Sequence, residues 1–120
     1  YIDDIVTGVI AALDRPAHVN PDWNPLAPDP ASSGVAPWRM LNLGASRRVE
    51  LMHYIEVLEK KLGRKAQLNL LPMQPGDVAQ TEADVTETRA ALDYAPSTPI
   101  EVGVSNFVDW YLDYYRVGSN

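Results

Sequence analysis

The sequence predicts a small α/β domain of about four helices with short strands. Apolar residues recur at helical spacing in several separate stretches, and short apolar runs ended by glycine or proline lie between them. A composition that is 46% hydrophobic is ordinary for a folded protein. At 120 residues the chain is close to the usual size of one domain, about 100–150 residues, so we expect one domain at most.

The first predicted helix follows a short extended start and ends before Pro16, because proline disfavours a helical residue in front of it. Asp3 and Asp4 are candidate N-cap residues. As neighbouring carboxylates they could also do acid–base chemistry, but helix capping accounts for them without it. The residues expected to form the buried stripe of this helix are Ile5, Val6, Val9, Ile10 and Leu13.

The segment 16–37 contains six of the ten prolines and has no apolar periodicity. Structureless connections longer than about 12–15 residues are uncommon in compact domains and are either functional or disordered. A mobile surface loop is the favoured interpretation. The alternative is a loop that Trp23 and Trp38 hold in place.

Two short apolar runs, 40–44 and 67–73, are predicted to be strands. A helix between them is predicted to start with Ser46 as its cap and to end at Gly63 in a left-handed conformation, after two lysines that suit the negative end of the helix dipole. The residues expected on its buried face are Leu51, Ile55, Leu58 and Leu62.

A short helix is predicted over 86–92, and a last helix has the clearest start signal in the chain. Thr98 is its expected N-cap, Pro99 takes the first helical position, and Glu101 follows three residues after the cap. The apolar side of this helix is expected to consist of Ile100, Val104, Phe107, Val108, Tyr111 and Tyr115.

Charge and residue content exclude several kinds of function. The formal charge of −6 without basic clusters argues against nucleic-acid binding, and no apolar run approaches the roughly 20 residues of a membrane span. The absence of cysteine excludes disulfides and thiolate zinc sites. We therefore expect a soluble, cytoplasmic domain without a signal peptide. The lack of an initiator methionine predicts a piece of a longer protein.

No self-contained active site can be assembled from the sequence. His18 and His53 have no neighbours at metal-ligand spacing, and the seven glycines form no phosphate-binding loop. We therefore predict no catalytic, cofactor-binding or metal-binding residue in this chain. The most informative segment is Met73–Val78, where a Pro-Gly turn at a strand end aims Asp77 outward. That carboxylate could accept hydrogen bonds from sugar hydroxyls, or it could simply cap the turn.

Six motifs in a fixed order carry a resemblance to a known family. They are Tyr1-Ile2-Asp3-Asp4-Ile5-Val6, Asn20-Pro21-Asp22-Trp23, Leu41-Asn42-Leu43-Gly44, Val49-Glu50-Leu51-Met52, Leu71-Pro72-Met73-Gln74-Pro75-Gly76-Asp77-Val78 and Phe107-Val108-Asp109-Trp110-Tyr111. Over essentially its whole length the chain resembles the C-terminal third of UDP-glucuronate 4-epimerases, which are NAD-dependent epimerase/dehydratase enzymes of the extended short-chain dehydrogenase family.

The resemblance implies that residues 1–120 are a C-terminal substrate-binding fragment without its N-terminal Rossmann domain. In the parent enzyme, an isomerase, NAD would bind to that missing domain and a Tyr-x-x-x-Lys pair would act on the sugar. No tyrosine here has a lysine four residues later. We therefore expect this chain alone to bind no NAD and to be inactive.

The resemblance also implies two substrate-binding residues. Asp77 matches an aspartate that hydrogen-bonds the nucleoside ribose, and Gln74 stands where related epimerases offer an arginine to the diphosphate, so its contact would be a neutral hydrogen bond. We expect weak UDP-sugar binding at best, and self-association through faces that the missing domain would cover. The alternatives are a truncated, non-enzymatic interaction module, or the same part of a UDP-glucuronate decarboxylase or dTDP-glucose dehydratase.

Overall fold

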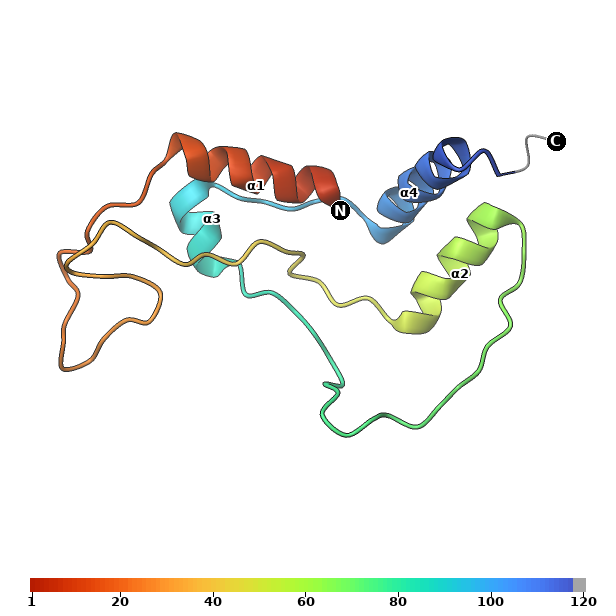
Figure 1. Ribbon diagram of the computed structural model, residues 1–120, viewed down its shortest axis with the longest axis horizontal. Helices are drawn as coiled ribbons and strands as arrows, with labels where there is room; N and C mark the ends of the chain where they lie inside the picture. Colours follow the sequence, from red (N-terminus) through yellow and green to blue (C-terminus); the bar gives the residue numbers. More distant parts are fainter. Residues whose placement is uncertain (118–120) are drawn as a thin grey trace. The chain divides into compact units, whose positions relative to one another are not determined.

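The computed structural model describes residues 1–117, so the last three residues of the expected domain 1–120 lie outside the described part. Its elements are four helices: α1 (Ile2–Asp14), α2 (Leu51–Leu62), α3 (Thr86–Leu92) and α4 (Ile100–Tyr114), joined by long irregular segments (Figure 1). The chain divides into two compact units. The α1–α3 unit comprises Ile2–Ser46 and Glu82–Pro96, and the α2–α4 unit comprises Tyr1, Arg47–Thr81 and the residues from Ser97 onward.

The core of the α1–α3 unit is built around Val85, Leu92 and Tyr94, all of which are buried. Gly8 lets α1 approach this core closely. A Cβ atom at Gly8 would lie 2.5 Å from Leu43 Cδ2 and 3.0 Å from Tyr94 Cε2, which is too close for either carbon pair. The absence of a side chain at this position therefore sets the distance between α1 and the segment that holds Leu43.

The expected stripe of α1 is not its buried face. Helix α1 begins at Ile2 without an extended start, and Gly8 is its only buried residue. Asp3 and Asp4 consequently lie inside the first turn rather than at the N-cap, where their charge still suits the positive end of the helix dipole. Much of the apolar stripe remains exposed. The prediction failed because it assumed that the more apolar side must face the core, whereas the close approach at Gly8 fixed the other side there.

The expected short strands are the part of the α/β class that the structure does not confirm. Within residues 1–117 the only β-type pairings are two isolated bridges, Asn24–Ala27 and Ser32–Arg39. A strand needs a neighbouring backbone to pair with. The segment 40–44 is instead held through Asn42. The Asn42 side-chain amide donates to the Asp84 backbone carbonyl, and the Asn42 backbone carbonyl accepts a hydrogen bond from the Thr88 hydroxyl.

The α2–α4 unit is held by two parallel helices. His53 Nε2 on α2 lies 2.8 Å from Glu101 Oε1 on α4, and Lys61 Nζ lies 2.6 Å from Asp109 Oδ2. Both contacts join residues 48 positions apart. The two helices therefore run in the same direction and in register.

Helix α2 ends as predicted and begins later than predicted. Gly63 adopts the left-handed conformation, with φ of 65°, and its N–H bonds the Glu59 carbonyl. The helix starts at Leu51 with Glu50 at the N-cap, so Ser46 does not cap it. On the expected buried face, Ile55 and Leu58 are half-buried, while Leu51 and Leu62 are exposed.

The two later helices agree well with the sequence prediction. Helix α3 covers Thr86–Leu92 as expected. Helix α4 starts at Ile100 with Pro99 at the N-cap, one residue later than the start predicted from Thr98. Val104 and Val108 form the buried side of α4, whereas its aromatic residues are exposed.

Candidate functional site

The predicted turn at the end of 67–73 forms in the α2–α4 unit. The Asp77 N–H donates to the Gln74 carbonyl at 3.1 Å, and Gly76 has φ of 96°. A type II turn has a positive φ at its third residue and often a proline at its second. Gly76 and Pro75 occupy these two positions. Glycine is favoured there because a side chain would strain this backbone.

Gln74 and Asp77 both lie on the surface of this turn. Their side chains are exposed, and within the described residues neither has a hydrogen-bond partner. The arms of the turn carry exposed apolar side chains as well, among them Leu70, Met73 and Val78. The turn thus presents to solvent a carboxylate, which can accept hydrogen bonds from hydroxyl groups, and an amide, which can also donate to phosphate oxygens.

A cavity of about 1010 Å³ lies elsewhere, in the α1–α3 unit. Its walls come from the end of α1, the Pro-rich loop and α3. Leu41 and Leu92 supply apolar lining, and Arg15, Trp38 and Glu87 supply polar and aromatic lining. Neither Gln74 nor Asp77 lines it.

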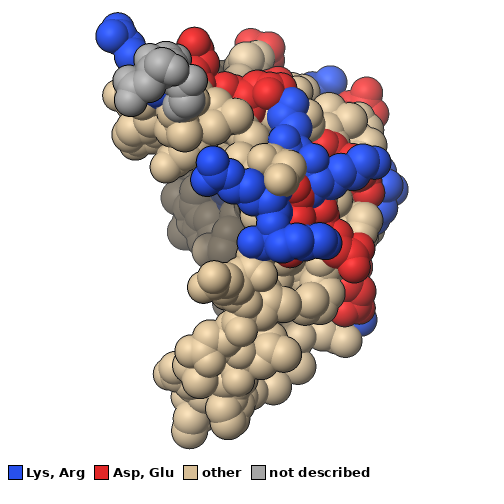
Figure 2. Space-filling view, turned by 90° about the vertical axis from the view of Figure 1, so that its right-hand side faces the viewer, with Lys and Arg blue, Asp and Glu red and all other residues tan. Residues whose placement is uncertain are grey.

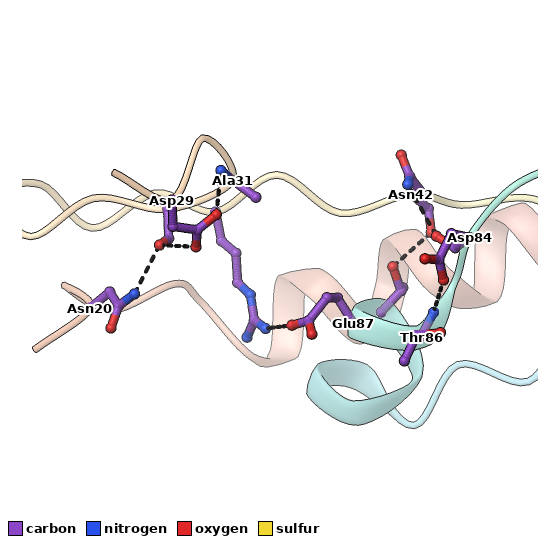
Figure 3. A network of polar contacts seen from close by, with 10 residues as sticks. Asn20, Asp29, Ala31, Asn42, Asp84, Thr86 and Glu87 are labelled. Atoms are coloured by element: carbon purple, nitrogen blue, oxygen red, sulfur yellow. Dashed lines mark hydrogen bonds and ion pairs between the residues drawn. The ribbon is translucent and has the colours of Figure 1, made fainter. Parts of the chain in front are cut away.

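Hydrogen bonds tie the Pro-rich loop to itself beside this cavity (Figure 3). Asn20 donates to the Ser32 hydroxyl at 2.9 Å, and Ser32 donates to Asp29 Oδ2 at 2.5 Å. The Ser32 hydrogen bond, and then that of the Ala31 N–H, hold the pKa of Asp29 below its usual 3.8. Trp23 also contacts the loop, because its indole N–H donates to the Asp29 carbonyl at 3.4 Å.

A second group of polar contacts joins the loop end to α3 (Figure 3). Arg39 Nη2 lies 2.9 Å from Glu87 Oε2. Thr88 is fully buried and donates to the Asn42 carbonyl at 2.7 Å, while Asp84 accepts from the Thr86 N–H at 2.9 Å. These groups satisfy one another, so the cavity wall is a structural network and not a set of free catalytic groups.

Thr88 and Tyr94 were not singled out from the sequence, although both organise the α1–α3 unit. Tyr94 is buried, and within the described residues its hydroxyl has no hydrogen-bond partner. Burial, and secondarily the Asp4 carboxylate, raise the pKa of this hydroxyl above its usual 10.0. The only sequence signal was Gly8, a glycine inside a helix, which often marks close packing.

The described residues form few other arrangements that could do chemistry. His53 pairs with Glu101, and no group of three or more potential metal ligands occurs in residues 1–117. Within the same range no helix has both the length and the apolar character to cross a membrane. On the face shown in Figure 2, Lys and Arg side chains adjoin Asp and Glu side chains.

The aromatic residues of α4 form a continuous row of ring contacts. Neighbouring ring centroids along the helix are 4.8–6.3 Å apart. All the members of this row are exposed, and they are Phe107, Trp110, Tyr111, Tyr114 and Tyr115. Phe107, Tyr111 and Tyr115 were expected on the apolar side of this helix, and all three are exposed.

Comparison with known proteins gives relatives that match nearly the whole chain. Protein CapI of Staphylococcus aureus is 43% identical over 116 residues, which are 97% of this chain and 34% of that protein. The probable UDP-glucuronate 4-epimerase of Rhizobium meliloti is 42% identical, with the same coverage of 97% and 34%. UDP-glucuronate 4-epimerase 1 of Arabidopsis thaliana is 37% identical over 96% of this chain and 26% of its own. No protein-family model matches the chain.

A solved structure gives the same result. The UDP-glucuronic acid 4-epimerase of Bacillus cereus, in complex with UDP-glucuronic acid and NAD, matches 96% of this chain with a TM-score of 0.69 and 26% identity. This chain covers 31% of that one. The resemblance to UDP-glucuronate 4-epimerases is therefore confirmed in sequence and in fold, and the chain spans about a quarter to a third of the length of these relatives.

Proposed function

We propose that this chain is the UDP-sugar-binding C-terminal part of a UDP-glucuronate 4-epimerase and is catalytically incomplete by itself. The observation that carries the proposal is that a relative matches nearly all of this chain, while the match covers only about a third of the relative. The probable epimerase of Rhizobium meliloti matches 97% of this chain at 42% identity, yet the match takes up only 34% of that protein. This relationship supports the proposal that the chain is part of a larger enzyme, whose activity would depend on the remainder.

Asp77 and Gln74 are the proposed substrate contacts. The type II turn holds both residues at one surface, and their side chains are exposed and without partners in the described residues. Asp77 would accept hydrogen bonds from the ribose hydroxyls of a UDP-sugar. Gln74 would donate to the diphosphate, more weakly than a charged donor would. The proposed contacts are one charged residue, Asp77, and one neutral residue, Gln74. With these two contacts alone, the chain by itself would bind UDP weakly.

Hydride transfer in such an enzyme is the chemistry of NAD, with which the Bacillus cereus relative was solved. This chain has no glycine-rich phosphate-binding loop and no Tyr-x-x-x-Lys pair. Its own residues would bind and orient the nucleotide end of the sugar. The segments 40–44 and 67–73 would become strands once the remainder of the enzyme supplies backbones for them to pair with.

A chimera tests the proposal. The 120 residues replace the matching third of the Rhizobium meliloti protein, and conversion of UDP-glucuronate to UDP-galacturonate is followed by chromatography. We expect turnover by the chimera and none by the chain alone. An Asp77→Ala chimera should show a raised KM for the UDP-sugar with a smaller change in kcat.

The same assay distinguishes the alternatives. Formation of UDP-xylose would indicate a decarboxylase, and a folded but inactive chimera would favour an interaction module. Epimerase activity in the chain alone would contradict the proposal outright. Folding of each protein is checked by circular dichroism, so that loss of activity is not confused with loss of structure.

A further inference from the structure

The cavity of the α1–α3 unit is large enough for a small molecule, and the proposed function does not use it. Its volume of about 1010 Å³ is at the upper end of the range of roughly 300–1,000 Å³ that is usual for small-molecule sites. Every residue in its walls belongs to the α1–α3 unit. Leu41, Ala91 and Leu92 give the cavity an apolar side. An apolar wall with a few polar groups is the common form of a ligand site.

Contacts between distant segments hold the walls of this cavity in place. Arg39 at the end of the Pro-rich loop pairs with Glu87 on α3 at 2.9 Å (Figure 3). Arg15 Nη1 at the end of α1 lies 3.4 Å from the Ala91 carbonyl oxygen on α3. Hydrogen bonds within the loop add to these contacts. A ligand would therefore enter walls that are already ordered, which lowers the entropy cost of binding.

Several polar side chains in the walls remain available to a ligand. Within residues 1–117, the Asp14 carboxylate, the His18 ring and the Trp38 indole N–H have no hydrogen-bond partner. Arg15 uses one of its five N–H groups, in the contact with Ala91. All four side chains are exposed, so a ligand can reach them. The other charged side chains of the walls bond to protein groups, and they are Asp29, Arg39 and Glu87.

The available groups differ in the chemistry that they recognise. The guanidinium of Arg15 and the imidazole of His18 can donate hydrogen bonds to anionic oxygens. The indole of Trp38 offers a flat face on which a ring can stack. The carboxylate of Asp14 accepts hydrogen bonds from hydroxyl groups. A ligand that satisfies all of them has an anionic group, a flat ring and hydroxyl groups.

We propose that this cavity is a second ligand site that takes a nucleoside monophosphate, separate from the turn that carries Gln74 and Asp77. The phosphate contacts Arg15 and His18, the base stacks on Trp38, and Asp14 accepts from the ribose hydroxyls. One phosphate fits better than two or three. Among the wall residues that the structure describes, Arg15 is the one arginine outside an ion pair, and the neighbouring Asp14 carboxylate repels additional negative charge.

A titration with three probes tests the proposal on the unaltered chain. The probes are AMP, adenosine, which lacks the phosphate, and ribose 5-phosphate, which lacks the base. Binding is followed by the NMR chemical shifts of backbone amides in the cavity walls and in the turn 74–77, and by calorimetry. We expect AMP to cause saturable changes in the wall residues and the other two probes to bind at least about tenfold more weakly, because each loses one kind of contact.

Paired substitutions assign the contacts to side chains. Arg15→Gln and Trp38→Ala should each weaken AMP binding by about tenfold. Arg64→Gln and Trp110→Ala are the matched controls, since both residues are exposed and lie in the α2–α4 unit. Both controls should bind AMP as the unaltered chain does. Circular dichroism checks that each variant folds, and the comparison of probes does not depend on any variant.

Three results would overturn the proposal. The first is the absence of saturable changes in the wall residues at millimolar AMP, or changes confined to the turn 74–77. The second is equal binding of adenosine and AMP, which would remove the phosphate contact. The third is AMP binding that persists unchanged in folded R15Q and W38A proteins.

The second site and the proposed function can fail separately. An active chimera together with no AMP binding by the chain would leave the function standing and overturn the site. AMP binding that depends on Arg15 and Trp38, together with a chimera that is folded but inactive, would support the site and contradict the function.

Discussion

Substitution of Gly8 by alanine should destabilise the chain, although alanine is the better helix former. A Cβ atom at this position would lie 2.5 Å from Leu43 Cδ2 and 3.0 Å from Tyr94 Cε2. Leu43 could rotate to relieve the first contact. Tyr94 cannot easily do so, since it is only 2% exposed and is part of the core. Helix α1 must therefore move away from the core, or the tyrosine ring must leave its place.

Two opposing terms decide the size of the effect. Replacing glycine with alanine inside a helix gains about 0.5–1 kcal/mol. Forcing an extra carbon into a well-packed core costs about 1–3 kcal/mol. Rotation of Leu43 relieves only the shorter contact, and the tight 3.0 Å contact with the buried Tyr94 remains, so the cost should be about 2 kcal/mol or slightly more. We expect a net loss of about 1–2 kcal/mol, or a melting temperature lower by about 3–8 °C for a chain of this size.

Gly103 is the matched control. It lies within α4, and a Cβ atom there would be 3.3 Å from Tyr1 Cδ2, a contact that the 41% exposed Tyr1 can relieve by moving. Gly103→Ala should therefore be neutral or stabilising by up to about 1 kcal/mol. Both variants are measured by urea unfolding followed by circular dichroism. A Gly8→Ala protein as stable as the Gly103→Ala protein would refute the close packing of α1 on Tyr94.

Three further predictions concern a buried hydroxyl, a helix contact and the candidate site. Thr88→Val should destabilise the α1–α3 unit by about 1–3 kcal/mol, because the fully buried Thr88 side chain would no longer donate to the Asn42 carbonyl. Thr88→Ser should retain most of the stability in urea unfolding, and equal losses in both variants would point to packing instead. The pKa of Glu101 is held below its usual 4.5 by its own backbone N–H and then by His53, so the stability this carboxylate gives is present above pH 4.5 and is lost as the pH falls through its lowered pKa. Glu101→Gln should flatten the acid limb of the pH–stability curve, and an unchanged limb would contradict the assignment. Asp77→Asn should reduce the changes in NMR chemical shift that UDP causes in the turn residues. The exposed control, Asp22→Asn, should leave these changes as they are. Equal changes in both variants would contradict a role of Asp77 in UDP binding.

Local signals predicted the helices well. The glycine at position 63 marked the end of α2 because only a residue that tolerates positive φ ends a helix in this way, and the structure has φ of 65° there. The Pro-Gly turn before Asp77 was also predictable, since proline and glycine at these positions favour a type II turn. In each case the physical cause lies within a few residues of the feature.

Features that depend on distant residues were missed. The apolar run 40–44 has strand composition, but strand formation needs a partner backbone that local sequence does not reveal. The buried side of α1 was assigned to the more apolar stripe, whereas the contact of Gly8 with Tyr94, residues 86 positions apart, decided the orientation. Thr88 became central only because the fold brings it to the carbonyl of Asn42.

The candidate site shows the same division. The sequence predicted the turn and the exposure of Asp77, which are local properties. It gave no indication of the cavity of about 1010 Å³ in the α1–α3 unit, because the Pro-rich loop, α1 and α3 contribute its walls from separate parts of the chain.

Each of the two units is made of segments that alternate along the chain, and this determines which fragments proteolysis can release. The chain leaves the α1–α3 unit at Ser46, returns to it at Glu82 and leaves it again after Pro96, while Tyr1 and the intervening and final stretches belong to the α2–α4 unit. No single cleavage can release either unit whole. A stop placed after Thr81 would remove α3 from one and α4 from the other, so limited proteolysis should yield either the intact chain or small peptides rather than a stable half.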